Sequence, residues 1–530
     1  MKKLIYALSI IFSIAFASSC NDLDVVPIGQ LSDGNFPVSD EDAIAVTNAV
    51  YTTNIRISTA LGYLFDLTTE LEAGDEGNPN GGSGLISSIR WDPTNSYWAS
   101  NWNRLYDIVT RANDVVDKIG SSNVVTPDLK KRLVGEAKFL RAYAYFYLVQ
   151  AWGEVPLALH ATDIAVPRTD INVVYKQIIQ DLEDAAVALP AAAQYAAEDK
   201  GRATQGAAYA YLSKVYLVWG QTDVTADAAT RKQRFTESVK NANLVTGYAL
   251  EEDFLANWSR TNRNGKESIF SVQHIQGQYA AGDGGNHLVH CAIAEGLTNA
   301  KKSHVYAPSE KYYNDFDDRD QRKNGTYIKH VDDDGTGNSF TFTSFLRFRK
   351  YAGEVLTQAQ ILAAAQTRDI NRTVIRYAEV LLLKAEAINE RDGAPNAEAY
   401  EAINQVRRRA FKQFPVTSPA IEPGVELPGG LDYAGFKAKI QQERVFELTY
   451  EQNRWTDLVR WRILQKTLKG AVENGDIPAS WGKQNVQPFN YRFPIPKAER
   501  DINPEGLWQN YGYDGYDPAK TGTDPYAGFE

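Results

Sequence analysis

Apolar residues recur at helical spacing along much of the chain. Between Leu105 and Ile119 they fall at steps of three or four, so they share one face of an amphipathic helix. Gly, Pro and polar clusters separate further runs of strong helix formers and mark where helices end. These patterns predict four more helices, at Lys131–Trp152, Val173–Leu189, Ala203–Trp219 and Arg231–Val245. Adjacent helices of this length, with Ala at close-approach positions, predict tetratricopeptide-like hairpins.

The segments before this array predict two helices and a loop. Ser39 or Asp40 caps the first helix, which continues through Ile44–Thr53, and Leu61–Glu72 forms the second. Gly and Asn-Pro make Gly74–Gly84 a loop.

The middle of the chain loses the helical pattern. Between Gly265 and Phe348, short strand-like runs (Ser268–Gln273 and Phe340–Phe348) alternate with Gly-rich turns, which predicts an irregular insertion. Helices are expected again further on. The predicted C-terminal elements are helices at Asn371–Arg391 and Asn396–Ala410 and an irregular tail at Tyr491–Tyr513.

The stretch Ile440–Trp461 combines helical periodicity with a high density of charge. One face is predicted to carry Val445, Leu448, Gln452, Trp455 and Val459. Oppositely charged residues stand three apart and can meet on a helix, as Arg444 with Glu447, Glu451 with Arg454, and Asp457 with Arg460. The hypothesis is that these charges are partly buried and fix how this segment docks. The alternative is an amphipathic helix with a salt-bridged outer face.

The same stretch resembles a family signature. ER-x-x-EL-x-x-E-x-x-RW-x-DL-x-RW, from Glu443 to Trp461, is similar to the C-terminal signature of the SusD/RagB family, surface lipoproteins of Bacteroidetes. Gln452 departs from it, because the family often has Gly there. Four more blocks resemble the family's in the expected order: EAKFLRAYAYFYLVQAWGEVPL, TQGAAYAYLSKVYLVWG, IRYAEVLLLKAEAIN and FPIPKAERDINPEGLWQNYGY.

The resemblance implies a mostly α, SusD-like fold, in which tetratricopeptide-like hairpins form a curved scaffold with a loop-rich, irregular insertion lobe. The expected division is a signal peptide at 1–19, a lipidated N-terminus and tether at 20–40, a helical scaffold at 41–250 with a ligand-loop region at 74–100, an insertion lobe at 251–370, and a C-terminal helical part with an irregular tail at 371–530.

The first residues form a leader. Lys2 and Lys3 precede a short apolar run, and Ala17-Ser18-Ser19-Cys20 is typical of a lipobox. Cleavage before Cys20 would allow its acylation, and two or three acyl chains anchor a protein stably. The alternative is plain signal-peptidase cleavage near Ser19.

Composition and charge narrow the class of partner. The 530 residues carry a formal net charge of −10, with no basic stripe, which argues against nucleic acid as a partner. The 29 Tyr and 10 Trp suit both a helical core and a surface that binds sugar rings.

Candidate ligand residues gather in two non-helical stretches. Sugars present flat apolar faces ringed with hydroxyls, so a binding site needs exposed rings and hydrogen-bonding side chains. The first stretch, beside the glycine loop, supplies Asp75, Arg90, Trp91, Asn95, Tyr97 and Trp98. The second, in the insertion, supplies Gln273, Tyr279 and His287. The alternative is that the rings of the first stretch cap the following helix. Trp102 and Tyr106 are assigned to the core.

No enzyme motif is present, so we expect no catalytic residue, no metal site and no cofactor. The expected function is nutrient binding at the exterior of the outer membrane, with lipid as the anchor. The resemblance implies an oligosaccharide or polysaccharide as ligand and a SusC-like TonB-dependent transporter as partner. A peptide ligand, as in the RagB branch, and a helical-repeat scaffold without a ligand are the alternatives.

Overall fold

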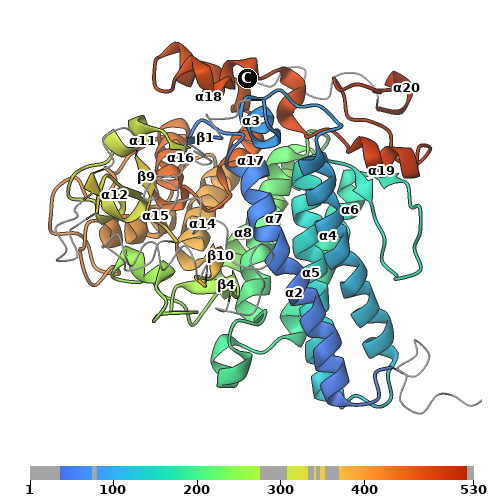
Figure 1. The fold of residues 1–530 in the computed structure, drawn as a ribbon. Coiled ribbons are helices and arrows are strands. Elements are labelled where there is room, and N and C mark those ends of the chain that lie inside the picture. Colours follow the sequence, from blue (N-terminus) through green and yellow to red (C-terminus); the bar gives the residue numbers. More distant parts are fainter. Residues whose placement is uncertain are drawn as a thin grey trace, which may run out of the picture.

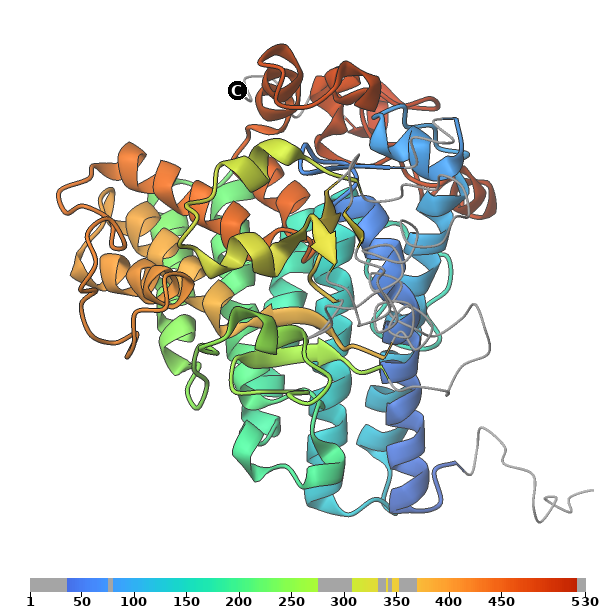
Figure 2. The ribbon, with the colours of Figure 1, turned by 60° about the vertical axis from the view of Figure 1, so that its left-hand side comes forward.

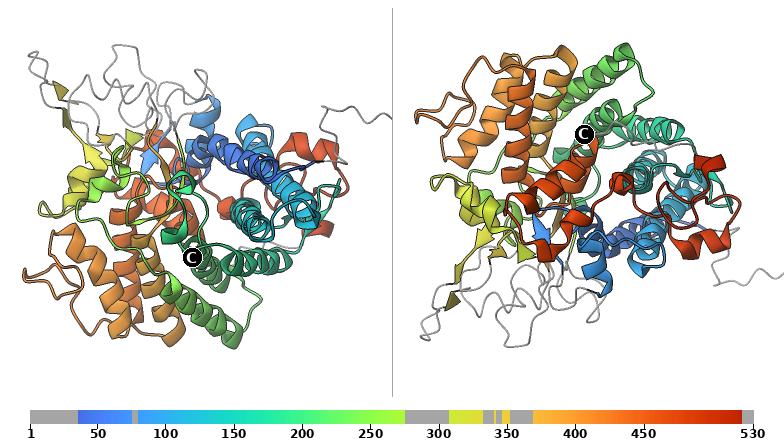
Figure 3. Two further views of the ribbon diagram at one scale, coloured as in Figure 1. Left: turned by 90° about the horizontal axis from the view of Figure 1, so that it is seen from below. Right: turned by 90° about the horizontal axis from the view of Figure 1, so that it is seen from above.

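Helices packed in a curved row form most of the molecule (Figure 1). The computed structural model describes residues 36–74, 80–274, 307–331, 340–341, 346–351 and 369–521. The row consists of α2 (Asp40–Phe65), α4 (Ser96–Asp114), α5 (Pro127–Trp152), α6 (Ile171–Ala188), α7 (Gln205–Thr222), α8 (Ala228–Leu244), α14 (Tyr377–Asp392), α15 (Ala397–Ala410) and α16 (Tyr433–Leu448). From α2 to α14, successive helices pack on one another along an arc, and α15 and α16 both pack on α14 (Figure 3). The predicted α scaffold with hairpin-like helix pairs is confirmed.

Shorter elements surround this row. The short helices are α3 (Gly82–Ser87), α11 (Glu310–Asn314), α12 (Gln321–Thr326), α17 (Arg454–Arg460), α18 (Leu464–Glu473), α19 (Lys497–Ile502) and α20 (Pro518–Thr521). The antiparallel strand pairs are β1 (Glu72–Ala73) with β5 (Ala307–Pro308), β2 (Val155–Pro156) with β3 (Arg168–Thr169), β4 (Ser268–Val272) with β10 (Arg372–Arg376), β6 (Tyr327–Ile328) with β9 (Arg347–Phe348), and β7 (His330–Val331) with β8 (Phe340–Thr341). Within the described ranges, no helix has the length and apolar character needed to span a membrane.

Local sequence signals set most helix ends. The predicted cap at Ser39 is present, since its hydroxyl accepts a hydrogen bond from the amide of Asp42 at 3.2 Å. The predicted stop after Trp152 also holds, because Gly153 adopts a φ of +78°, a conformation that favours glycine.

Two helix predictions need correction. Ile44–Thr53 and Leu61–Glu72 were expected as separate helices, but α2 runs unbroken to Phe65 because no Gly or Pro interrupts residues 54–60. The predicted helix Asn371–Arg391 begins as strand β10, whose Thr373, Val374 and Ile375 favour the extended pairing with β4.

The stretch Ile440–Trp461 is two helices, so the prediction of one continuous helical face is wrong. Helix α16 ends at Leu448 and α17 begins at Arg454, with Tyr450 and Gln452 at φ values of 65° and 63° between them. Left-handed conformations stop a helix and are tolerated best by glycine. The break therefore stands where the resembling family often carries Gly.

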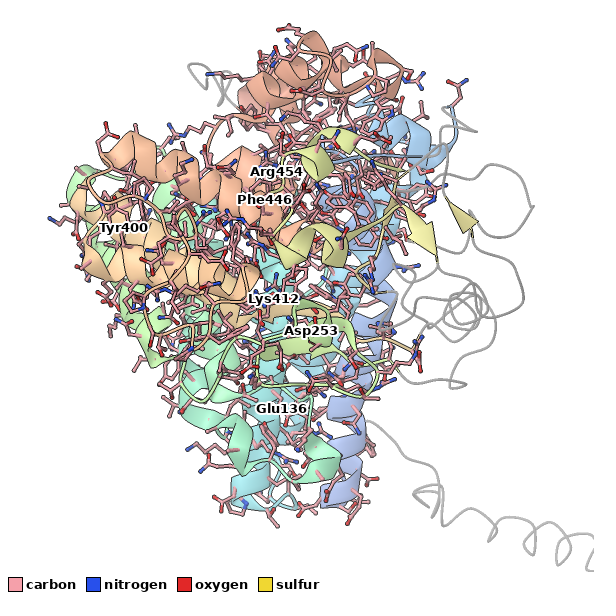
Figure 4. The ribbon with its side chains drawn as sticks, turned by 90° about the vertical axis from the view of Figure 1, so that its left-hand side faces the viewer. Glu136, Asp253, Tyr400, Lys412, Phe446 and Arg454 are labelled. Atoms are coloured by element: carbon pink, nitrogen blue, oxygen red, sulfur yellow. The ribbon has the colours of Figure 1, made fainter. Side chains whose placement is uncertain are left out.

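The hypothesis that the charges of this stretch are buried is confirmed. Glu447 has no exposed surface and accepts hydrogen bonds from Arg376, Arg409 and Arg322, the last at 2.9 Å. Its neighbours complete a buried charge network, which consists of Glu267, Asp320, Arg322, Lys350, Arg376, Arg407, Arg409, Glu443, Glu447 and Glu451. The network joins β10, α12, α15 and α16. The guanidinium of Arg322 lies over the ring of Phe446, which Figure 4 labels on α16, at 5.9 Å from its centroid.

The partners within the stretch differ from those that helical spacing predicted. Of the three predicted pairs, Asp457 with Arg460 is present at 2.9 Å. Glu451 instead pairs with Lys350 at 2.7 Å and Arg376 at 2.9 Å, and Arg454 pairs with Glu70 at 2.6 Å. Arg444 pairs with Asp457 at 2.8 Å. The break before α17 separates Glu451 from Arg454. Arg444 and Glu447 both lie within α16, and each instead pairs with residues of other segments.

The C-terminal segment closes over the N-terminal helices (Figure 2). The indole N–H of Trp152 donates to the carbonyl of Pro494 at 3.0 Å, and the amide of Phe493 donates to the carbonyl of Ala151 at 2.9 Å. Phe493 is fully buried and stacks on Trp455 with ring centroids 4.4 Å apart. The two ends of the sequence therefore share one core, which also supports the segment between α3 and α4.

Candidate functional site

The predicted ligand segment Arg90–Trp98 forms the turn between α3 and the first residues of α4. Asp92 accepts hydrogen bonds from the hydroxyl and the amide of Thr94, at 2.6 and 2.7 Å, and these bonds lower the pKa of its carboxyl group. Asn95 caps α4 by accepting from the amide of Tyr97 at 3.1 Å, and its amide donates to the carbonyl of Gly82 at 3.1 Å. Asn95 therefore has a structural role in the turn.

The two tryptophans of this segment differ in accessibility. Trp98 lies within α4, has no exposed surface and packs against Phe493 at 5.2 Å. The prediction that the Trp98 ring is exposed is therefore wrong. The ring instead packs at the start of the following helix, which was the alternative. Trp91 is half-buried, because it packs edge-on against Phe493 at 5.0 Å and donates its indole N–H to the carbonyl of Ile86 at 2.9 Å.

The accessible part of the segment is a small aromatic and polar patch. Tyr97 is half-buried and packs edge-on against Tyr63 of α2 at 4.6 Å. A Cβ atom at Gly82 would stand 2.5 Å from the Tyr97 ring, so a glycine is required beneath this ring. Arg90 is exposed, and its guanidinium donates to Ser88 at 2.9 Å and to Asn80 at 3.1 Å.

We call Asn80, Arg90, Trp91, Tyr97 and Tyr63 the α3–α4 patch. Its rings can cover an apolar sugar face, and its guanidinium and amide groups can bond hydroxyls. Tyr63 was not among the predicted residues. In the sequence, Tyr63 belongs to an apolar run, and no nearby motif indicates that it contacts Tyr97.

The predicted Gln273 lies elsewhere, at the end of β4. Its side-chain oxygen accepts from the amides of Asn264 and Asn371, each at 2.9 Å, and its own amide donates to Asn264 at 3.0 Å. Gly201, at a φ of +100°, packs against the same side chain, and a Cβ there would lie 2.5 Å from it. Gln273 thus ties three loops together. Cys20, Asp75, Tyr279 and His287 lie outside the described residues.

The carboxylates of Glu70 and Glu72, which follow α2, are buried. Glu70 pairs with Arg454 at 2.6 Å and accepts from the hydroxyl of Tyr312 at 3.0 Å. Burial raises the pKa of Glu72 well above its ordinary value, and the neighbouring Asp66 raises it further, against the effect of Lys483. Among the residues that the structure describes, no group of three or more His, Cys, Asp or Glu side chains could hold a metal ion.

Comparisons with known proteins extend over nearly the whole chain. The sequence model of the SusD family matches residues 221–513, and a model described as "Starch-binding associating with outer membrane" matches residues 77–217. SusD-like protein P2 of Formosa agariphila is 27% identical over 97% of this chain and 100% of its own length.

Solved structures share the fold. A SusD homologue from Bacteroides thetaiotaomicron superposes with a TM-score of 0.74 at 25% identity, covering 90% of this chain and 97% of its own. Surface glycan-binding protein A from the same organism, in complex with laminarihexaose, superposes with a TM-score of 0.69 at 20% identity, covering 89% of this chain and 99% of its own. With the SusD-family model alone matching more than half of the sequence, this chain belongs to the SusD family.

Proposed function

We propose that the protein is a cell-surface lipoprotein that captures an oligosaccharide or polysaccharide and delivers it to a SusC-like TonB-dependent transporter. Membership of the SusD family carries this proposal. The description of the second matching model and the laminarihexaose bound to a structural relative support a glycan as ligand and the outer membrane as location. The ligand would be held by contacts and not cleaved.

The α3–α4 patch is the proposed contact surface. It combines two half-buried tyrosines, a half-buried tryptophan and an exposed arginine within one turn and the adjoining helix. Asp75 is proposed to extend the patch, and Tyr279 and His287 to contribute from the insertion. A shallow site of this kind binds weakly, with a Kd of roughly 10 μM to 1 mM. Such affinity suffices if a transporter beneath keeps the local concentration of ligand high.

Removing the patch rings is expected to weaken glycan binding. In affinity electrophoresis against a panel of polysaccharides, one glycan should retard the protein, and Tyr97→Ala and Trp91→Ala should each reduce this retardation at least about tenfold, since stacked aromatic contacts dominate such sites. Tyr400→Ala is the matched control. Tyr400 is a half-buried tyrosine on α15, at a distance from α3 (Figure 4), so this variant should be retarded normally.

Two results would count against the patch or the ligand. If both variants are still retarded, the protein binds a glycan, but the α3–α4 patch is not the binding site. If no glycan retards the protein, a peptide pool becomes the next set of ligands, and the glycan proposal fails.

Lipid attachment at Cys20 is tested separately. Cys20→Ala should abolish labelling by a fatty-acid analogue and move the protein from the membrane fraction to the soluble fraction. The reason is that each buried methylene contributes about 0.8 kcal/mol, so two or three acyl chains hold a protein at the bilayer. Ser19→Ala, which keeps the cysteine, is the control. Unchanged membrane partitioning of Cys20→Ala would exclude this anchor.

A further inference from the structure

A cavity of about 590 Å³ lies at the meeting point of α7, α8, α14, α16 and the residues that follow α17. It is separate from the α3–α4 patch, with which it shares no lining residue. Its volume falls within the range of roughly 300–1,000 Å³ that small-ligand sites occupy. Phe235 and Trp461, both largely buried, form its apolar floor, and the guanidinium of Arg460 covers one face of the Trp461 ring at 4.6 Å from its centroid.

The lining is basic although the chain as a whole is acidic. Six basic side chains (Arg231, Lys232, Arg391, Lys437, Arg460 and Arg462) face two acidic ones (Glu390 and Asp392), a balance of +4 in a chain of net charge −10. Focused positive charge in a concave site raises the local concentration of anions.

Three of these cations are held in ion pairs. Arg460 pairs with Glu386 and with Asp457 at 2.9 Å, Arg391 pairs with Asp392 at 2.8 Å, and Lys437 pairs with Glu390 at 2.9 Å. The other three are held less tightly. Arg462 donates to the carbonyl of Gln221 at 3.4 Å. Arg231 and Lys232 lie near the carboxylates of Asp227 and Asp392 and help to lower the pKa values of these groups, but neither forms an ion pair with a described residue.

Arg231 ends the first turn of α8, a helix of 17 residues that begins at Ala228, and Lys232 follows it. The N-terminal end of a helix carries a partial positive charge, which adds to that of the side chains. Asp227 caps this end by accepting from the amide of Thr230 at 2.7 Å. Arg462 lines the same cavity, and burial and the charge of Arg231 lower the pKa of its guanidinium group.

Arg462 occupies a backbone position that suits glycine. It follows α17 with a φ of +60°, and the amides of Arg462 and Ile463 donate to the carbonyls of Val459 and Leu458, each at 3.0 Å. This is the left-handed helix end at which glycine is the usual residue. An arginine in this conformation strains the backbone and places a long cationic side chain in the cavity lining.

We propose that this cavity binds an acidic saccharide unit, through its carboxylate or sulfate group at Arg231, Lys232 and Arg462 and its ring over Phe235 and Trp461. An aromatic floor beneath a cationic rim matches a ring that carries an anion better than it matches a bare ion. The choice of a saccharide rests on the proposed function, and the site adds that the captured glycan contains acidic residues.

Calorimetric titration of the intact protein with galacturonate, glucose 6-sulfate, glucose and inorganic sulfate tests this. We expect at least one acidic sugar to bind, and glucose and sulfate to bind at least about tenfold more weakly, because charge-assisted hydrogen bonds and the apolar floor are both needed. Arg231→Ala should weaken binding of the acidic sugar at least about tenfold. Lys439→Ala, an exposed lysine of α16 outside the cavity, should leave binding unchanged.

Arg462→Gly separates binding from folding. Glycine fits the left-handed position, so the thermal unfolding midpoint should stay unchanged or rise. Binding of the acidic sugar should nevertheless be lost. The proposal is overturned if neither acidic sugar binds, if glucose or sulfate binds as tightly, if Arg231→Ala or Arg462→Gly leaves binding intact, or if an acidic peptide binds and the sugars do not. Failure of the proposed function would be seen in a different experiment. In that case no polysaccharide of the panel retards the protein in affinity electrophoresis, whether or not the monosaccharides bind in the titration.

Discussion

Replacing Glu447 by alanine is expected to lower the free energy of unfolding by about 3–5 kcal/mol, the usual effect of removing one partner from a buried ion pair. The carboxylate is fully buried and lies between Arg376, Arg409 and Arg322. Its loss leaves three guanidinium groups without a central counter-charge. Chemical unfolding followed by circular dichroism measures the change.

An ion pair whose carboxylate is largely exposed provides the control, and its buried arginine, Arg408, keeps a second partner in Glu426 at 2.6 Å. Glu401 pairs with Arg408 at 2.9 Å but keeps 43% of its side chain exposed, so Glu401→Ala should cost at most about 1 kcal/mol. If Glu447→Ala is no more destabilising than Glu401→Ala, the network does not hold the fold together.

The pH dependence of stability gives a second measure of Glu447. Burial alone would raise the pKa of its carboxyl group, but Arg409, Arg376 and Arg322 outweigh burial and hold this pKa below its ordinary value. A carboxyl with a depressed pKa in the folded state stabilises the protein above its unfolded pKa, about 4.5, and this stability is lost as the pH falls. The wild-type protein should therefore lose more stability than Glu447→Ala between about pH 5 and pH 3.

Replacing Phe493 by alanine is the second change for which a large effect is expected, about 3–5 kcal/mol of unfolding free energy. The ring is fully buried and contacts Trp455, Trp98 and Trp91. The cavity left behind removes these contacts and the support beneath the α3–α4 patch. Chemical unfolding followed by tryptophan fluorescence measures the effect, and glycan retardation should weaken as well.

Phe489→Ala is the control for the same segment. Phe489 is half-buried and packs on Tyr513 at 4.9 Å. Its replacement should therefore lower the free energy of unfolding by less and leave glycan binding unchanged. Equal destabilisation by the two substitutions would show that the aromatic cluster around Phe493 contributes nothing beyond ordinary burial.

The sequence predicts the helical row well because its signals are local. Apolar spacing, the Ser39 cap and the Gly153 stop act within a few residues, and the structure retains them. The break between α16 and α17 has no such signal, since Glu443–Trp461 keeps a helical period. Only the Gln that replaces a frequent family Gly points to the positive φ at 452.

The binding surface was harder to predict because exposure is not a local property. Trp91 and Trp98 have similar sequence surroundings, yet Trp98 is buried beneath Phe493, a residue nearly 400 positions away. Tyr63 joins Tyr97 from another helix. The burial of the charges was predicted, but their partners were not, because Glu451 pairs with Arg376 and Lys350 in distant segments rather than with Arg454 beside it.

The closure of the C-terminal segment over the N-terminal helices has a consequence for the order of folding. Trp152 and Ala151 receive their partners from Phe493 and Pro494, so the core around α4 and α5 stays open until the chain is almost finished. Contacts between such distant residues slow folding. A nascent chain that emerges N-terminus first therefore exposes Trp98 and Trp152 to solvent for most of its synthesis. Because exposed apolar surface promotes aggregation, an incomplete chain is expected to be prone to aggregation until Phe493 and Pro494 have been synthesised.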